Sequence, residues 1–189
     1  MDEAQIRVGR TSQILAFQKE NIVLDILALS KALGCCLPLP CVSTCVKIEH
    51  GCKEAGLMWL TTDSNTRSQL MLATKCCRLR DYICKHASER GGQLRSRFIK
   101  LQQKYWFIGD IRGRGLLQGI EFISNPKAKS FDSDLGQAVS ECAMTCGISC
   151  NIVSLSGMGG VFRLAPPVIV TAEEIEEGLK ILDKTSSFV

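Results

Sequence analysis

One lysine stands alone in a long apolar stretch of this 189-residue chain. Lys31 is the only lysine in the mostly apolar run of residues 21–46, and Asp2 stands well upstream of it. A lysine ammonium is costly to bury unless its charge is lost or paired, so such a lysine is a candidate for forming a Schiff base. Pyridoxal phosphate (PLP) chemistry needs a lysine that holds the aldehyde and an acid that keeps the pyridine nitrogen protonated. The spacing alone fits two unrelated surface charges as well, and it leaves both interpretations open.

Predicted strands would place these two side chains at one edge of a sheet. Residues 22–29 are rich in leucine and β-branched side chains, which suits a buried strand, and Lys31 follows at its end. Ligands of α/β sheets usually lie at such strand ends. Asp2 could lie opposite Lys31 if the chain between them forms a crossover unit joining parallel strands. Residues 41–46 are predicted to form a further strand.

The rest of the chain mixes helices and strands. Residues 68–101 have a helical composition with a break at Gly91-Gly92, which predicts two helices. A short helix or a turn is predicted over 48–56, a helix over 135–145, and strands within 105–123, over 147–153 and over 161–165. Thr171 and Glu174 form a capping box that opens a final helix. The inward side chains of this helix are expected to be Ile175, Leu179 and Leu182.

Several sequence blocks carry a family resemblance. They are residues 2–5 (Asp-Glu-Ala-Gln), 9–11 (Gly-Arg-Thr), 25–34, 109–115 and 157–167. In this order they resemble the class III PLP-dependent aminotransferases, and most of all the 2,2-dialkylglycine decarboxylases. The resemblance implies an α/β fold, namely the C-terminal part of a PLP-dependent transferase of fold type I (aspartate-aminotransferase-like). Residues 1–75 would then form the C-terminal part of the large PLP-binding domain, and residues 76–189 the small C-terminal α+β domain, while the N-terminal half would be absent.

The resemblance also implies which residues hold the cofactor. Lys31 matches the lysine that forms the Schiff base with PLP and then moves protons at the substrate carbon. Asp2 matches the acid that bonds the pyridine nitrogen, and Gln5 the glutamine beside the ring hydroxyl. Thr62, with Thr61 as the alternative, matches a threonine that reaches the cofactor phosphate of the neighbouring subunit. The glycine-rich phosphate cup would lie in the absent half, so we expect the isolated chain to bind PLP weakly.

A substrate site and a reaction follow from the same resemblance. Arg163 matches the arginine that binds the substrate carboxylate, and Gln5 lies near the departing carboxylate in the decarboxylases. The implied function is PLP-dependent transamination between amino acids and 2-oxo acids, with a decarboxylation-dependent form as the finer assignment, in a homodimer or higher oligomer. The alternative is a truncated, catalytically inactive homologue that serves as an interaction module or has no function.

Composition and charge bear on other function classes. Residues 67–114 hold 12 Lys or Arg and 3 Asp or Glu, and an exposed helix face is favoured over a nucleic-acid site. The uncharged run of residues 142–162 contains glycines and polar side chains, and we expect no membrane span.

The 11 cysteines fit no common zinc spacing, not even Cys41, Cys45 and Cys52 with His50, so no metal is expected. Reduced thiols and the lack of a signal pattern predict a cytoplasmic protein.

Overall fold

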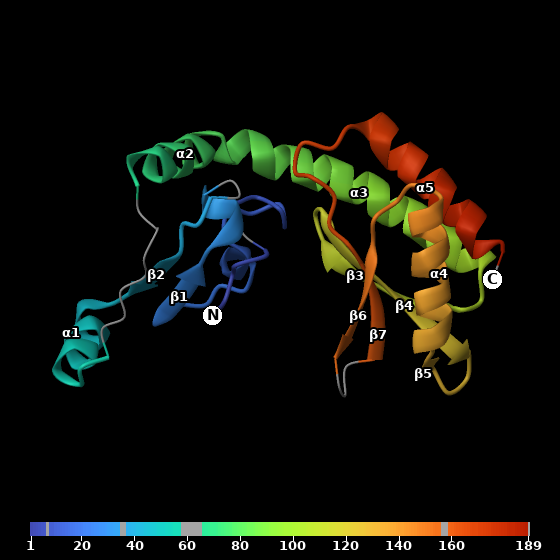
Figure 1. The fold of residues 1–189 in the computed structure, drawn as a ribbon, viewed down its shortest axis with the longest axis horizontal. Helices are drawn as coiled ribbons and strands as arrows, with labels where there is room; N and C mark the ends of the chain where they lie inside the picture. The colour runs from blue at the N-terminus through green and yellow to red at the C-terminus, as the bar shows by residue number, and fades with distance from the viewer. Residues whose placement is uncertain (7, 35–36, 58–65, 156–158, 189) are drawn as a thin grey trace. The chain divides into compact units, whose positions relative to one another are not determined.

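The computed structural model describes the chain except residues 7, 35–36, 58–65, 156–158 and 189 (Figure 1). It divides into two compact units, Met1–Lys85 (unit 1) and His86–Val189 (unit 2). The boundary between the units lies within helix α3 (Arg80–Lys104), whereas the predicted domain boundary after residue 75 lies within helix α2 (Arg67–Arg78). The assignment of the two parts to the large and small domains of a transferase stays a prediction.

Unit 1 contains a small sheet and short helices. Strands β1 (Ile26–Leu29) and β2 (Cys41–Thr44) pair antiparallel. The start of the chain runs beside β1 in the parallel direction, since Asp2 bridges Ala28. The remaining elements are the 3-10 helices η1 (Ala16–Lys19) and η2 (Lys31–Gly34) and the α-helices α1 (Val46–Glu54) and α2.

The strand predicted over residues 22–29 is shorter than expected and is not buried on both faces. Only residues 26–29 form β1; Val23 is 98% exposed and Ile26 46% exposed, whereas Leu27 is buried. A strand is buried on both faces only where other layers cover both, and the described part of unit 1 buries the Leu27 face alone. The strand predicted over 41–46 ends at Thr44 because Val46 already begins α1.

The predicted helix break at Gly91-Gly92 is wrong. Helix α3 runs through both glycines, and the break lies at Leu79, between α2 and α3. Gly91 is buried, and a Cβ atom placed on it would come within 2.4 Å of the Gly115 main chain. This glycine therefore allows close packing of the helix against a turn. Its poor helix propensity is outweighed because most helical stability in proteins comes from tertiary packing.

The sheet of unit 2 has five antiparallel strands. Four lie side by side in the order β3 (Ile108–Arg114), β4 (Leu117–Asn125), β7 (Gly159–Leu164) and β6 (Asn151–Leu155). The short strand β5 (Ser130–Phe131) pairs with the far end of β4. The two strands predicted within 105–123 are β3 and β4, and the strands predicted over 147–153 and 161–165 are β6 and β7 with shifted ends.

The core of unit 2 lies between this sheet and three helices. Side chains of α3, α4 (Ser133–Thr145) and α5 (Ala172–Ser186) pack with side chains from one face of the sheet; Figure 1 shows the course of these elements. Phe98 of α3, Phe122 of β4 and Phe162 of β7 are almost fully buried, and the ring centroids of Phe122 and Phe162 are 5.8 Å apart. Aromatic pairs at this separation add to the stabilisation from buried apolar area.

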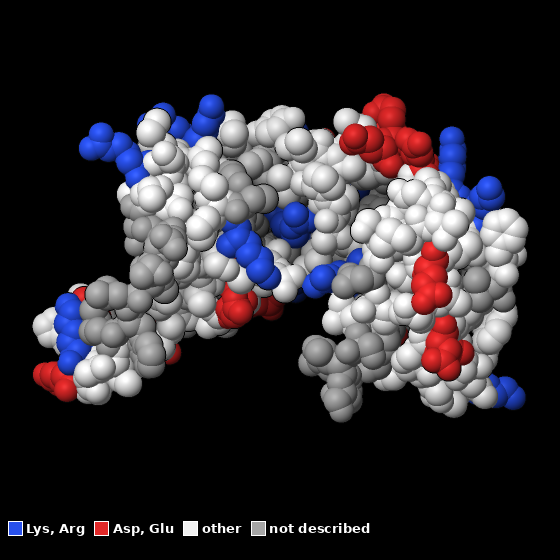
Figure 2. Space-filling view, in the orientation of Figure 1, with Lys and Arg blue, Asp and Glu red and all other residues white. Residues whose placement is uncertain are grey.

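The start of α5 confirms the predicted capping box. The Thr171 hydroxyl accepts the Glu174 N–H, and the Glu174 carboxylate accepts the Thr171 N–H. The three side chains expected to face inward, Ile175, Leu179 and Leu182, are buried. Figure 2 shows acidic side chains gathered over the beginning of this helix, where they oppose the positive end of its dipole.

The basic block of residues 67–114 falls largely on helices α2 and α3. Its side chains Arg67, Lys75, Arg78, Arg80 and Lys85 are exposed. No helix among the described residues combines the length and the apolar character that crossing a membrane would need.

Candidate active site

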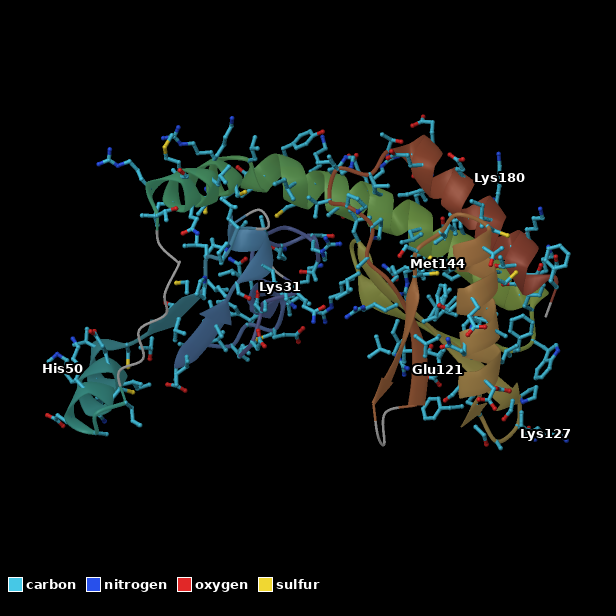
Figure 3. All side chains as sticks on the ribbon, viewed as in Figure 1. Lys31, His50, Glu121, Lys127, Met144 and Lys180 are labelled. Atoms are coloured by element: carbon cyan, nitrogen blue, oxygen red, sulfur yellow. The ribbon has the colours of Figure 1, made fainter. Side chains whose placement is uncertain are left out.

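The backbone at Lys31 has an uncommon conformation. Ser30 alone separates Lys31 from β1, and Lys31 opens η2 with φ of 46°, in the left-handed region (Figure 3). Few residues other than glycine adopt this conformation, and Lys31 shares it here with Val8, Ser12, Asn21 and Lys129. The turn is held by a Leu33 N–H to Ser30 carbonyl bond of 3.2 Å. Close packing of Gly34 supports it, because a Cβ there would lie 2.9 Å from the Leu39 Cβ. The Lys31 side chain is exposed within the described chain.

Asp2 lies beside β1, the strand that leads to Lys31. The Glu3 N–H donates to the Ala28 carbonyl, and the Ala28 N–H donates to the Met1 carbonyl, both at 2.9 Å. These bonds hold Asp2 beside Ala28 in parallel pairing. The exposed Asp2 carboxylate accepts the Ala4 N–H at 2.8 Å. Asp2 is therefore the parallel neighbour of β1, and Lys31 opens η2 beyond the end of that strand.

Glu3 is a buried acid whose importance the sequence did not reveal. Its side chain is fully buried, and its two carboxylate oxygens accept the N–H groups of Ala16 at 2.9 Å and Phe17 at 2.8 Å. These are the first N–H groups of η1, which have no partner inside the helix. Glu3 thus ties the segment carrying Asp2 to η1. Nothing in the run Asp2-Glu3 distinguishes the structural acid from the exposed one, because the difference depends on residues far along the chain.

The block at residues 9–11 packs against the start of α3. Gly9 has φ of 80°, and a Cβ on it would lie 2.5 Å from the Ile83 side chain, so the position requires glycine. Thr11 is buried and its hydroxyl donates to the Ile6 carbonyl at 3.4 Å. Burial lowers the pKa of the Arg10 guanidinium from its ordinary value. This block therefore supports the chain that follows Gln5, an exposed residue in the turn after Glu3.

Two of the predicted site residues lie elsewhere. Thr62, and the alternative Thr61, fall outside the described residues. Arg163 is in β7 of unit 2, whereas Lys31, Asp2 and Gln5 are in unit 1. The structure thus groups Asp2 and Lys31, with Gln5 nearby in the chain, and assigns Arg163 to the other unit.

Arg163 lies in a row of residues that crosses the sheet of unit 2. It pairs with Gly119 of β4 on one side and Asn151 of β6 on the other. Its neighbours Phe162 and Leu164 pack into the core, so strand alternation directs the Arg163 side chain to the opposite face.

The same face of the sheet carries an ion-pair network one and two strands away. Arg112 of β3 pairs with Glu121 of β4, which is buried and labelled in Figure 3. Arg112 also lies 3.5 Å from Asp110. Charge-assisted bonds of this kind satisfy a carboxylate that would otherwise be costly to bury.

The described residues contain groups that suit PLP and none that suggest a metal. Among them, no three His, Cys, Asp or Glu side chains come together as a possible metal site. The described cysteines are free thiols. An amine for the aldehyde and a carboxylate for the ring nitrogen are the donor set that PLP needs, and unit 1 holds both, in Lys31 at the start of η2 and in Asp2 beside β1.

Comparisons with known proteins agree with this chemistry. The family model described as Aminotransferase class-III matches residues 1–185. An uncharacterized aminotransferase of Schizosaccharomyces pombe is 38% identical over 190 residues, covering 100% of this chain and 42% of that protein.

Solved structures show the same fold. A transaminase from the marine bacterium Virgibacillus matches with a TM-score of 0.87 at 21% identity, covering 99% of this chain and 44% of that one. A taurine:2-oxoglutarate aminotransferase from Bifidobacterium kashiwanohense, solved with PLP and glutamate, matches with a TM-score of 0.82 at 23% identity, covering 100% of this chain and 43% of that one. The fold class predicted from the sequence is confirmed. The chain spans less than half the length of each of these relatives.

Proposed function

Since the chain belongs to the class III aminotransferase family, we propose that it carries the Schiff-base lysine of a transaminase that exchanges amino groups between amino acids and 2-oxo acids. Class III aminotransferases are PLP-dependent. The observation that carries the proposal is the placement of Lys31. It stands in a left-handed conformation directly after β1, and Asp2 pairs with that same strand. Strained residues of this kind, with a reactive side chain, are typical of active sites.

In this proposal the residues of unit 1 have separate tasks. When bound, PLP supplies an electron sink for the carbanion at the substrate Cα. Lys31 holds the cofactor aldehyde and afterwards, as a free amine, moves a proton to or from the substrate Cα. The Asp2 carboxylate favours the protonated form of the ring nitrogen, because an adjacent negative charge raises the pKa of such a group. Gln5 offers an amide to the ring hydroxyl.

Arg163 would recognise the substrate. A guanidinium binds a carboxylate with two parallel hydrogen bonds, which fixes orientation as well as charge. We propose that Arg163 binds the carboxylate common to amino acids and 2-oxo acids. Replacing Arg163 by Ala in an active assembly is expected to raise KM for carboxylate-bearing substrates and to spare amines without one.

A finer assignment is decarboxylation-dependent transamination, as in the 2,2-dialkylglycine decarboxylases. It is supported by Gln5 and by the block from residues 151 to 167, which resemble that subgroup. In this assignment Gln5 and Arg163 would orient the substrate and so decide whether its carboxylate or its hydrogen is lost from Cα. Release of CO₂ from 2-aminoisobutyrate, followed by transamination of pyruvate, is the expected activity. Transamination without any CO₂ would leave only the general class III assignment.

The test is a reconstitution. The chain is co-expressed with the N-terminal part of a related class III aminotransferase, and amino transfer to pyruvate is measured. Lys31→Ala should abolish turnover, whereas Lys19→Ala, which removes an exposed lysine of η1, should not. Sedimentation of the assembly tests the proposed homodimer or higher oligomer. An assembly that takes up PLP but is unaffected by Lys31→Ala contradicts the proposal. A folded assembly that takes up no PLP favours the alternative of a non-catalytic interaction module.

A further inference from the structure

Two thiols meet at the C-terminal end of α4. Cys142 lies in the last turn of the helix, and Cys146 is its C-terminal cap. Their side chains are hydrogen-bonded to each other, and the Cys146 N–H donates to the Cys142 carbonyl at 3.0 Å. Both residues are partly exposed, so a small molecule can reach them. This arrangement suits thiol–disulfide exchange, because the second thiol can attack the mixed disulfide that the first has formed.

The surroundings of Cys142 determine which thiol reacts first. Partial burial raises the pKa of the Cys142 thiol, and the charge and the hydrogen bond of Cys146 raise it further. Because the thiolate is the nucleophile, a raised pKa makes Cys142 a slow first attacker. Once Cys146 is in a mixed disulfide it can no longer ionise, so its charge no longer opposes a thiolate at Cys142. The positive charge of Lys184 on α5, which lowers the pKa of Cys142, remains.

The geometry of the helix end predicts a strained bridge between the two residues. Side chains four residues apart on a helix have Cβ atoms about 5–6 Å apart, whereas a disulfide needs about 3.5–4.5 Å. Cys146 can move closer because it lies beyond the last helical residue. Gly147 follows it with φ of 99°, and nothing lies within 4 Å of the Cβ position of this glycine. Strained disulfides are more easily reduced, so the bridge is expected to open as well as to form.

We propose that Cys142 and Cys146 form a reversible modification site for small disulfides of the glutathione class. In the first step the Cys146 thiol gives its proton to water, and its sulfur attacks one sulfur of the small disulfide. The S–S bond of the small molecule breaks, and one half leaves as a thiolate that takes up a proton. In the second step the Cys142 thiolate attacks the Cys146 sulfur, and the other half leaves in the same way.

The exchange balances without a further reactant. Two protein thiols are oxidised to one disulfide, and one small disulfide is reduced to two thiols. The site does not depend on the proposed aminotransferase function, because neither Cys142 nor Cys146 is assigned to cofactor or substrate.

Cys150 provides a matched control in the same region. Its thiol donates to the Ile148 carbonyl at 3.7 Å, and burial raises its pKa to about 11. The thiol is therefore almost fully protonated near neutral pH, and it should take no part in the exchange. Cys150→Ser keeps a hydrogen-bond donor for the Ile148 carbonyl, so this variant should react as the wild type does.

The experiment incubates the full chain with an excess of oxidised glutathione, alkylates the remaining thiols and maps the products by mass spectrometry. Cleavage with trypsin and cyanogen bromide places Cys142 in fragment 130–144 and Cys146 in fragment 145–158. The two fragments should stay joined, with the loss of two hydrogens, in the wild type and in Cys150→Ser. Because the second attack is intramolecular, the bridged form should exceed the glutathione adduct by about tenfold or more.

Cys142→Ser should instead accumulate the glutathione adduct on Cys146, since the second attack is no longer possible. Excess reduced glutathione should reopen the wild-type bridge. The proposal is overturned by a wild-type pair that stays reduced or stops at the adduct, by a bridge that requires Cys150, or by a bridge that reduced glutathione does not open. Absence of the adduct from a folded Cys142→Ser chain overturns it as well.

Discussion

Two adjacent glycines of α3 should respond in opposite ways to the same substitution. A Cβ on Gly91 would lie 2.4 Å from the carbonyl carbon and oxygen of Gly115 and 2.5 Å from its Cα. These are main-chain atoms of the turn between β3 and β4, so they cannot move aside as a flexible side chain could. Overpacking of this kind costs about 1–3 kcal/mol, against about 1 kcal/mol gained in helix propensity. Gly91→Ala is therefore expected to lower the free energy of unfolding by up to about 2 kcal/mol.

Gly92→Ala is the matched control, because Gly92 is exposed and nothing lies within 4 Å of its Cβ position. Only the helix propensity changes there, so stability should rise by about 0.5–1 kcal/mol. Urea unfolding followed by circular dichroism measures both values, and amide exchange in α3 and the β3–β4 turn localises the change. Two alanines with effects of the same sign and similar size would refute the close contact between α3 and Gly115.

Three other outcomes are expected. Borohydride reduction of the chain with PLP, followed by peptide mapping, should label Lys31 in preference to exposed lysines such as Lys19; even labelling of all surface lysines would contradict the assignment. Glu3→Ala should destabilise unit 1 by about 2–5 kcal/mol, because it leaves one buried and one part-buried N–H group of η1 without this acceptor. Loss of exchange protection at those two amides is the readout. The hydrogen bond from Lys104 lowers the pKa of Asp183 in the folded chain. This pair therefore stabilises the folded chain fully at pH values above the unfolded pKa of about 3.9. The stabilisation is lost as the pH falls through the lower pKa of the folded state. Asp183→Asn should thus lower the free energy of unfolding by less than about 1 kcal/mol at neutral pH, since both side chains are well exposed. The difference in stability between this variant and the wild type should shrink in acid. A difference in stability that grows on acidification would contradict the predicted direction.

The candidate site could be predicted in part because its signals are local. Lys31 follows a short run of strand-forming residues, and the structure does end β1 just before it. The parallel neighbour of that strand was also expected, and Asp2 occupies it. The extent of the strand was overestimated, because apolar composition at residues 22–25 does not say whether a second layer covers them. The role of Arg163 stays a prediction. Its position between the core residues Phe162 and Leu164 determines on which face of the sheet its side chain lies, but not what that side chain binds.

Sequence alone determined those features of this protein that depend on neighbours along the chain. The capping box of Thr171 and Glu174 and the inward face of α5 follow from bonds and spacings within a few residues, so they could be predicted. Tertiary structure decided the features that depend on distant contacts. Gly91 behaves as a packing residue and not as a helix break because the Gly115 turn lies against it, and Glu3 is structural because η1 presents two N–H groups to its carboxylate. The physical reason is that a glycine or a carboxylate is compatible with several environments, and only the folded chain determines which atoms come within contact distance.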